Sequence, residues 1–406
     1  MADTVPLYAR QPIFNRRRDV VAYELLFRGG GGNQAVFPDG NMATAQVLLK
    51  VFGENDIHDV IGEHKAFVNY TRTLICTPPP LPSRQLVVEV LEDIRADDEV
   101  LAGLKRLREA GYQIALDDFL VTPDTLAMVK YADYIKVDVL ALSTAELHKI
   151  ATRLRPLGKT LLAEKVETHE MMSLCEQLGF ELFQGYFLCR PEIIKGVAVS
   201  EGKQAVLRLI AVVNDPDVEM QEIITTIATD PSLSYKMLKL VNSSAIGLSR
   251  KIESLGQAVT LLGLRAIRNW ATFLLMANAS DKPQELCVIS MCRAKFCEQL
   301  GIKAGGRALG DACFTVGLLS NLDAFLDLPM EKLLEKLKLS DEISAALLER
   351  HGTMGDILSL VSHYERGNWQ EVNWTLLADM GVEAADINQC YSHSVAWASE
   401  SVSSQR

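Results

Sequence analysis

Short apolar runs, rich in β-branched and aromatic residues, recur along the first half of the chain, and this composition is typical of strands. The predicted strands cover residues 20–27, 66–70, 85–92, 112–118, 134–138, 160–166 and 180–187. Between most of them, apolar residues three and four positions apart predict helices over residues 42–53, 97–111, 144–158 and 168–179. This alternation predicts parallel strands joined by crossover helices. About eight strands in this length are within reach of a (β/α)8 TIM-like barrel.

The pattern changes near residue 200. Beyond it the strand-like runs disappear, and apolar residues recur at helical spacing. In one such segment Leu233 and Met237 share a face, and Ser232, after Pro231, is the expected helix cap. The fold class is therefore α/β plus all-α, with an α/β domain over residues 1–200 and a helical domain over residues 201–406.

Charge and turn residues bear on the binding partners. The net charge of −11 argues against broad affinity for nucleic acid. The basic run at residues 16–18, between Asn15 and Asp19, is best explained as a solvated hairpin turn, with a nucleic-acid patch as the weaker alternative. The four glycines at residues 29–32 lack a following Gly-Lys-Ser/Thr, so they predict a flexible loop and not a phosphate loop.

Cysteine usage and hydropathy point to the cytoplasm. The eight cysteines form no C-x-x-C pair, which favours reduced, mostly buried thiols. The amino-terminal residues contain no apolar leader segment. No apolar run approaches the roughly 18–20 residues that span a bilayer. We therefore expect a cytoplasmic protein without membrane segments.

Two adjacent carboxylates, Asp117 and Asp118, follow the predicted strand that begins at residue 112. Neighbouring side chains on a strand point to opposite faces, so both can reach one ligand only where the strand ends. Two nearby carboxylates repel each other unless a cation lies between them. Taken alone, the pair is better explained as a loop that begins with two aspartates.

The pair is not alone, because polar groups end nearly every predicted strand. In a β/α barrel the chemistry lies where the strands end at the carboxyl-terminal face. The candidate residues are Glu24, Asn69, Glu89, Glu92, Asp117, Asp118, Lys136, Glu164, Glu167 and Gln184. Carboxylate and amide oxygens suit Mg²⁺ or Mn²⁺ better than Zn²⁺. Unrelated polar strand ends facing solvent do not explain a set spread over seven strands.

The ordered motifs resemble the EAL-domain family, the phosphodiesterases of the bacterial messenger cyclic di-GMP. The segment "YELLFR" resembles the family's E-A-L-x-R signature, with Leu25 in the place of alanine. The segment "ARQPI" resembles its first strand. Then "VEVLE", "LDDF", "YIKVD", "AEKVET" and "FQGYFLCRP" follow in the family's order. The resemblance covers residues 5–195.

The resemblance implies a two-metal hydrolysis of cyclic di-GMP to linear pGpG. It makes Mg²⁺ or Mn²⁺ the cofactor. The metal ligands would be Glu24, Asn69, Glu89 and Asp117 at the first metal, with Asp117 bridging, and Asp118 at the second. The catalytic group would comprise Lys136, which would orient or deprotonate the attacking water, with Glu164, Gln184 and the supporting Glu167. The remaining roles would be substrate binding for Gln11 and Arg28 and loop support for Glu92.

Three departures keep a second hypothesis open. The stiff segment Leu120–Pro123 replaces the family's Gly- and Ser-rich loop, so the second metal site is in doubt. Lys165 stands where the family has glycine, and residues 29–41 replace the usual segment after the signature. The alternative is a catalytically weak or inactive cyclic di-GMP receptor that signals through the helical half. The enzyme is favoured because no metal ligand is missing; a barrel acting on another phosphodiester has less support.

The helical half resembles the HDOD family, a relative of HD phosphohydrolases that lacks their metal-binding His-Asp pair. The segments "DPSLSYKMLKLVNSSAIG", "IESLGQAVTLLGLRAIRNW" and "FTVGLLSNLD" carry this resemblance. Ser320-Asn321 stands where a catalytic relative would have His-Asp, and neither residue is a strong metal ligand. The resemblance implies a regulatory module that binds a protein partner. A homodimer is implied by the resemblance of the first half to the EAL family, through the loop after Asp118.

Overall fold

In the computed structural model the chain divides into two compact units. Unit 1 comprises Met1–Arg190 and Ser359–Arg406, and unit 2 comprises Pro191–Leu358. The structure describes residues 7–28, 60–79, 83–192, 201–215, 217–242, 252, 254–277, 282–337, 339–382 and 384–403. The predicted helix at residues 42–53 and the segment at residues 29–41 lie outside this part.

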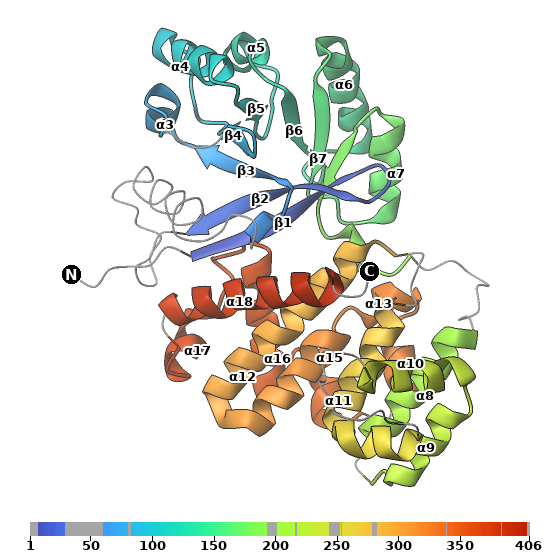
Figure 1. Cartoon of the computed structure of the whole chain (residues 1–406). Helices are drawn as coiled ribbons and strands as arrows, with labels where there is room; N and C mark the ends of the chain where they lie inside the picture. The colour runs from blue at the N-terminus through green and yellow to red at the C-terminus, as the bar shows by residue number, and fades with distance from the viewer. Residues whose placement is uncertain are drawn as a thin grey trace. The chain divides into compact units, whose positions relative to one another are not determined.

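Unit 1 is built on a closed barrel of eight strands, in which sequence neighbours pair and β1 closes on β8 (Figure 1). The strands are β1 (Leu7–Asn15), β2 (Val20–Arg28), β3 (Lys65–Tyr70), β4 (Leu86–Val90), β5 (Gln113–Leu116), β6 (Tyr134–Asp138), β7 (Thr160–Glu164) and β8 (Leu182–Gln184). Strands β2 to β8 are parallel to one another. The predicted TIM-like barrel is thus confirmed.

The first strand departs from the all-parallel expectation, because β1 is antiparallel to both β2 and β8. Its connection to β2 is too short for a crossover, so the two strands form a hairpin. The Asn15 side-chain oxygen accepts hydrogen bonds from the backbone N–H groups of Arg17 and Asp19, at 2.8 and 3.0 Å. Arg18 adopts a positive φ of 64°. The basic run is therefore a hairpin turn, as predicted.

The helices of the barrel begin at well-formed caps. They are α3 (Arg72–Cys76), α4 (Asp98–Glu109), α5 (Pro123–Val129), α6 (Thr144–Leu154) and α7 (His169–Gln177), with short 3-10 turns at Arg155–Leu157 and Phe187–Cys189. Each α-helix follows a Ser, Thr or Asp whose side chain accepts a hydrogen bond from the first helical turn. These caps fix where each loop after a strand ends, and so help to shape the rim of the barrel.

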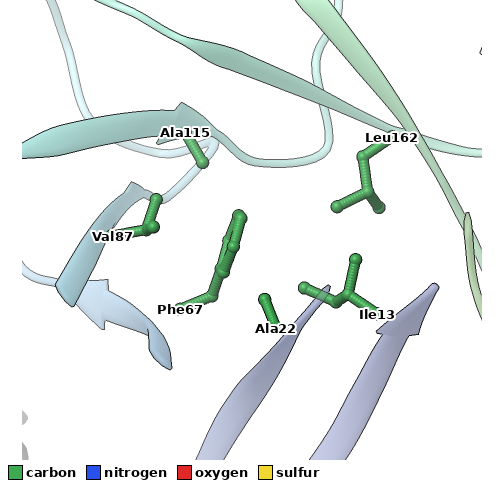
Figure 2. Packing of buried hydrophobic residues seen from close by; sticks show 6 residues of the cluster. All are labelled: Ile13, Ala22, Phe67, Val87, Ala115 and Leu162. Atoms are coloured by element: carbon green, nitrogen blue, oxygen red, sulfur yellow. The ribbon is translucent and has the colours of Figure 1, made fainter. Parts of the chain in front are cut away.

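An apolar layer fills the barrel interior. It consists of the buried residues Ile13, Ala22, Phe67, Val87, Ala115 and Leu162, with Tyr134 and Leu182 packed against it. Figure 2 shows the six buried side chains projecting from their strands toward a common centre. Since side chains on a strand alternate between faces, the residue two positions along each strand also points inward. This apolar layer therefore forms a floor directly beneath the next set of inward-pointing residues, which is nearer the carboxyl-terminal ends of the parallel strands.

Unit 2 is helical in its described residues. Its helices are α8 (Glu201–Asn214), α9 (Met220–Ala228), α10 (Pro231–Val241), α11 (Leu255–Ala277), α12 (Gln284–Leu319), α13 (Leu322–Leu326), α14 (Met330–Leu337), α15 (Asp341–Leu348) and the first part of α16 (Gly352–Glu365). The expected cap of α10 is wrong by two positions. Asp230 caps the helix, because Pro231 is already its first residue and Ser232 lies inside it.

The last helices, α17 (Trp374–Asp379) and α18 (Ala384–Ser403), belong to unit 1. Helix α18 contacts β1: the Tyr8 hydroxyl lies 2.8 Å from that of Ser392, and the Arg10 N–H donates to the Tyr391 hydroxyl at 3.1 Å. The sequence predicts one helical domain over residues 201–406, whereas in the structure residues 359–406 form part of the same compact unit as the barrel. Among the described residues, no helix is both long and apolar enough to cross a membrane.

Candidate active site

A polar layer lies directly above the apolar floor. Counting two residues from each floor residue toward the rim gives Gln11, Glu24, Asn69, Glu89, Asp117, Lys136, Glu164 and Gln184. Asp117 lies just beyond β5, and its N–H donates to the Val90 carbonyl at 3.0 Å, which extends the β4–β5 ladder by one step. All eight strands thus contribute one polar side chain to the same level of the barrel.

The four carboxylates of this polar layer, on Glu24, Glu89, Asp117 and Glu164, surround the side-chain ammonium of Lys136. The Lys136 Nζ lies 2.6 Å from Glu89 Oε1, 2.8 Å from Asp117 Oδ1 and 2.8 Å from Glu164 Oε1. Glu24 Oε2 is 3.5 Å away. The Lys136 side chain is only 1% exposed. Four carboxylates around one ammonium leave the cluster with a charge of −3 when all are ionised.

The charge excess perturbs the acid–base behaviour of the cluster. Burial, reinforced by the nearby Glu24 carboxylate, raises the pKa of Glu89 well above its usual value. Burial also raises the pKa of Glu164 to about 8, although the Lys136 ammonium opposes this. Burial alone would lower the pKa of Lys136, but the surrounding carboxylates raise it, so the ammonium stays charged. The cluster therefore favours the uptake of further positive charge.

The donor atoms of the cluster fit a hard divalent cation. Several buried side-chain oxygens of this layer have no hydrogen-bond partner, although some of them form ion pairs with Lys136. These oxygens belong to Asn69, Glu89, Asp117, Glu164 and Gln184. Such oxygens are the ligands that Mg²⁺ and Mn²⁺ prefer. No three His, Cys, Asp or Glu side chains of the described ranges form a ready-made metal cage. The Lys136 ammonium instead lies at the point where the carboxylates meet.

Two glutamine amides connect the cluster to β1. The Gln184 Nε2 donates to Glu24 Oε2 at 2.5 Å and to Gln11 Oε1 at 2.9 Å. Gln184 therefore holds the signature glutamate and the predicted substrate-binding glutamine together. The turn that follows is constrained: Gly185 has φ 151°, and a Cβ there would lie 2.1 Å from the Val166 carbonyl oxygen.

Asp118 lies beside a second, smaller charged group. It adopts a positive φ of 39°, and burial followed by repulsion from Asp117 raises its pKa. Lys165 also has a positive φ, of 55°, which accounts for the preference for glycine at this position. Its Nζ lies 2.5 Å from Asp138 Oδ2. Nothing in the sequence indicated this partner, Asp138, which lies two residues beyond Lys136 on β6.

Two further predicted residues, Glu167 and Glu92, are not part of the Lys136 cluster. Glu167 forms an ion pair with Arg190 at 3.0 Å, about half exposed to solvent. Glu92 is exposed, although its charge contributes to the raised pKa of Asp118. Arg28 is the last residue of β2, and its side chain lies outside the described part.

In unit 2, the Ser320-Asn321 pair takes part in a buried polar network. Arg293 donates to Ser320 Oγ at 2.9 Å and to Asn321 Oδ1 at 2.8 Å, and Asn321 donates to Ser290 Oγ at 2.9 Å. A guanidinium cation thus lies against the two residues that stand in the place of a His-Asp pair. This arrangement is structural and offers no anionic metal ligand at these two residues.

Two family models match successive parts of the chain. The EAL domain family matches residues 56–191, a range that begins after Gln11 and Glu24, and the HDOD domain family matches residues 202–381. The chain is 33% identical over 389 residues to the cyclic di-GMP phosphodiesterase CdgJ of Vibrio cholerae, covering 94% of this chain and 89% of that protein.

Two further proteins are similar to this chain. The uncharacterized protein YuxH of Bacillus subtilis is 35% identical over 402 residues, covering 96% of this chain and 97% of that protein. Klebsiella pneumoniae BlrP1, solved as a calcium and cyclic di-GMP complex, matches 45% of this chain and 54% of its own with 25% identity and a TM-score of 0.37. By its likeness to CdgJ over nearly its whole length, the chain belongs to the family of proteins that join an EAL domain to an HDOD domain.

Proposed function

We propose that the protein is a metal-dependent cyclic di-GMP phosphodiesterase that hydrolyses its substrate to linear pGpG. The observation that carries the proposal is the convergence of Glu24, Glu89, Asp117 and Glu164 on one buried point. The 33% identity to CdgJ, which is named a cyclic di-GMP phosphodiesterase, supports the choice of substrate.

The residues that would hold the first metal are Glu24, Asn69, Glu89 and Asp117, and Asp118 would serve a second. Divalent cations at such a site stabilise the charge that develops on the phosphate and supply a hydroxide nucleophile at neutral pH. Mg²⁺ and Mn²⁺ are the candidates, because every donor is an oxygen.

The side chains of this protein would then position and balance charge. The Lys136 ammonium offsets part of the negative charge of the neighbouring carboxylates and can donate a hydrogen bond to the attacking water or to a phosphate oxygen. Gln184 fixes Glu24 through its amide, at 2.5 Å. Glu164, whose pKa is raised to about 8, can hold a proton at neutral pH and release it. Gln11 and Arg28 would bind the substrate at the rim, with Glu167 and Glu92 supporting the neighbouring loops.

One observation favours the alternative of a weak or inactive receptor. The Lys165 ammonium, paired with Asp138, lies close enough to Asp118 to oppose the rise in the pKa of that carboxyl, so it competes with a second cation there. The following loop exposes Leu120 and Val121 where the family has a polar segment. Under this alternative the barrel binds cyclic di-GMP and the helical unit passes the signal on.

The helical unit is proposed to be a regulatory module that binds a protein partner. Ser320 and Asn321 stand in the place of a metal-binding His-Asp pair and are hydrogen bonded to the buried guanidinium of Arg293. This arrangement is consistent with a binding role for the unit and not with a second hydrolase site. We also propose a homodimer through the loop after Asp118, in which the exposed apolar side chains of Leu120 and Val121 would be covered.

Incubation of the purified protein with cyclic di-GMP and Mn²⁺ is expected to yield pGpG, measured by chromatography. Addition of EDTA is expected to stop product formation, and excess Mn²⁺ to restore it, because the carboxylate cluster needs a divalent cation to act on phosphate.

The same samples distinguish the alternatives. Binding of cyclic di-GMP without any pGpG at micromolar protein would replace the enzyme with the receptor. Neither binding nor turnover would reject both, and turnover that persists in EDTA would reject the metal dependence.

A further inference from the structure

The turn after α16 brings a residue of the carboxyl-terminal segment to the rim of the barrel. Helix α16 ends at Glu365, and the next residue, Arg366, accepts a hydrogen bond at its carbonyl from Gln11 Nε2, at 2.6 Å. Gln11 is in turn hydrogen bonded to Gln184, and Gln184 to Glu24. Two side-chain amides therefore connect the backbone of this turn with the carboxylate cluster.

The turn is held rigidly against the barrel. Tyr364, which is fully buried, donates through its hydroxyl to the Tyr8 carbonyl at 3.2 Å. Gly367 has φ 67°, and a Cβ there would lie 2.4 Å from Leu26 Cδ1 on β2. A residue other than glycine would be strained at this positive φ and would have to displace the Leu26 side chain. The backbone at Arg366 is thus fixed before any ligand arrives.

The guanidinium of Arg366 is also positioned. Its Cζ lies 3.9 Å from the centroid of the Tyr186 ring, and Tyr186 follows β8 just beyond Gln184. Arg366 is exposed, and within the described residues it makes no ion pair. A guanidinium stacked on an aromatic ring keeps its N–H groups free to donate outward in the plane of the guanidinium.

A cation at the rim would balance negative charge that the ligand brings to the site. The carboxylate cluster carries an excess of negative charge, whereas a cyclic dinucleotide brings two phosphodiester anions. Among the cations near the site whose side chains the structure describes, Lys136 is surrounded by carboxylates, Lys165 pairs with Asp138, and Arg190 pairs with Glu167. Arg366 can offer a planar, charged donor group to an incoming phosphate.

We propose that Arg366 is a substrate-binding residue that contacts the phosphate of the cyclic dinucleotide that is not cleaved. The proposal rests on the proposed function, since it assumes a ligand with two phosphates, one at the carboxylate cluster and one at the rim. It assigns to the carboxyl-terminal segment a direct part in the site of the barrel.

The test compares Arg366→Gln, Arg366→Lys and the matched control Arg17→Gln in the full-length protein. Arg17 is exposed in the β1–β2 turn, at the opposite end of the barrel from the carboxylate cluster. We expect Arg366→Gln to raise both the Kd and the KM for cyclic di-GMP about tenfold, as for one lost charge-assisted hydrogen bond, with kcat within about twofold. Arg366→Lys keeps the charge without the planar fork and should lose only about threefold. Arg17→Gln should match the wild type.

Equal Kd values in Arg366→Gln and Arg17→Gln would overturn the proposal. If Arg366→Gln also lowers the melting temperature, Arg366→Lys decides: regained affinity supports ligand contact, and affinity no better than that of Arg366→Gln refutes it. Wild-type protein that does not bind cyclic di-GMP at all would reject the proposed function itself. Normal wild-type binding with an unaffected Arg366→Gln would reject only the role of Arg366.

Discussion

Replacement of Asp117 by asparagine is expected to reduce kcat for cyclic di-GMP by roughly a thousandfold or more. Mutation of a residue that hydrogen bonds to a metal ligand already lowers activity or metal affinity about 10–100-fold, so mutation of a metal ligand itself should lower kcat further. Asp117 lies 2.8 Å from the Lys136 Nζ, and its Oδ1 has no hydrogen-bond partner of good geometry. The amide keeps the shape of the side chain but loses the charge that would bind a divalent cation. Initial rates with saturating Mn²⁺ measure the effect.

Asp124→Asn is the matched control, because Asp124 is exposed in the first turn of α5, outside the cluster. It removes the same charge and is expected to change kcat less than about twofold. Activity of Asp117→Asn close to that of this control would show that the ligand assignment is wrong.

Replacement of Lys136 by methionine is expected to destabilise the metal-free barrel by about 3–5 kcal/mol. The Lys136 side chain is 1% exposed and neutralises part of the charge of Glu89 and Glu164. Without the ammonium, buried carboxylates repel one another or must take up protons. Mn²⁺ should restore much of this stability, since a ligand that binds only the folded state stabilises it. Urea unfolding with and without Mn²⁺ measures both effects.

Lys149→Met serves as the comparison, because Lys149 is exposed on α6. Its free energy of unfolding should change by no more than about 0.5 kcal/mol, with no added dependence on Mn²⁺. A Lys136→Met protein as stable as Lys149→Met without metal would contradict the charge-balancing role of Lys136.

The barrel and its polar layer could be predicted from the sequence, because both follow from the alternation of side chains along each strand. Strand alternation places Glu24 two residues beyond Ala22 and Glu89 two residues beyond Val87, on the inner face. Once the strands are recognised, closure of the barrel brings these positions to one level. The strand ends therefore predicted the cluster without knowledge of a single long-range contact.

Contacts that depend on how distant segments pack were not accessible in the same way. The hydrogen bond from Gln11 to Arg366 joins residues 355 positions apart. No periodicity or motif relates these two positions, and the helical pattern near α16 gives no sign that its end meets the barrel. The pairing of Lys165 with Asp138 likewise requires β6 and β7 to be neighbours in register.

The central role of Lys136 also emerged only in three dimensions. Sequence reasoning assigned it to the attacking water, as one polar strand end among several. The structure places its ammonium at the meeting point of Glu89, Asp117 and Glu164. Which of eight inward side chains becomes the centre depends on strand stagger and side-chain length, and sequence alone specifies neither.

Anomalous diffraction from crystals grown with Mn²⁺ tests the central claim most directly. The account predicts a strong manganese peak in the barrel, within coordination distance of Glu24, Asn69, Glu89 and Asp117, with the Lys136 ammonium displaced to its edge. A barrel without any manganese peak under saturating Mn²⁺, with Lys136 still enclosed by all four carboxylates, would contradict it.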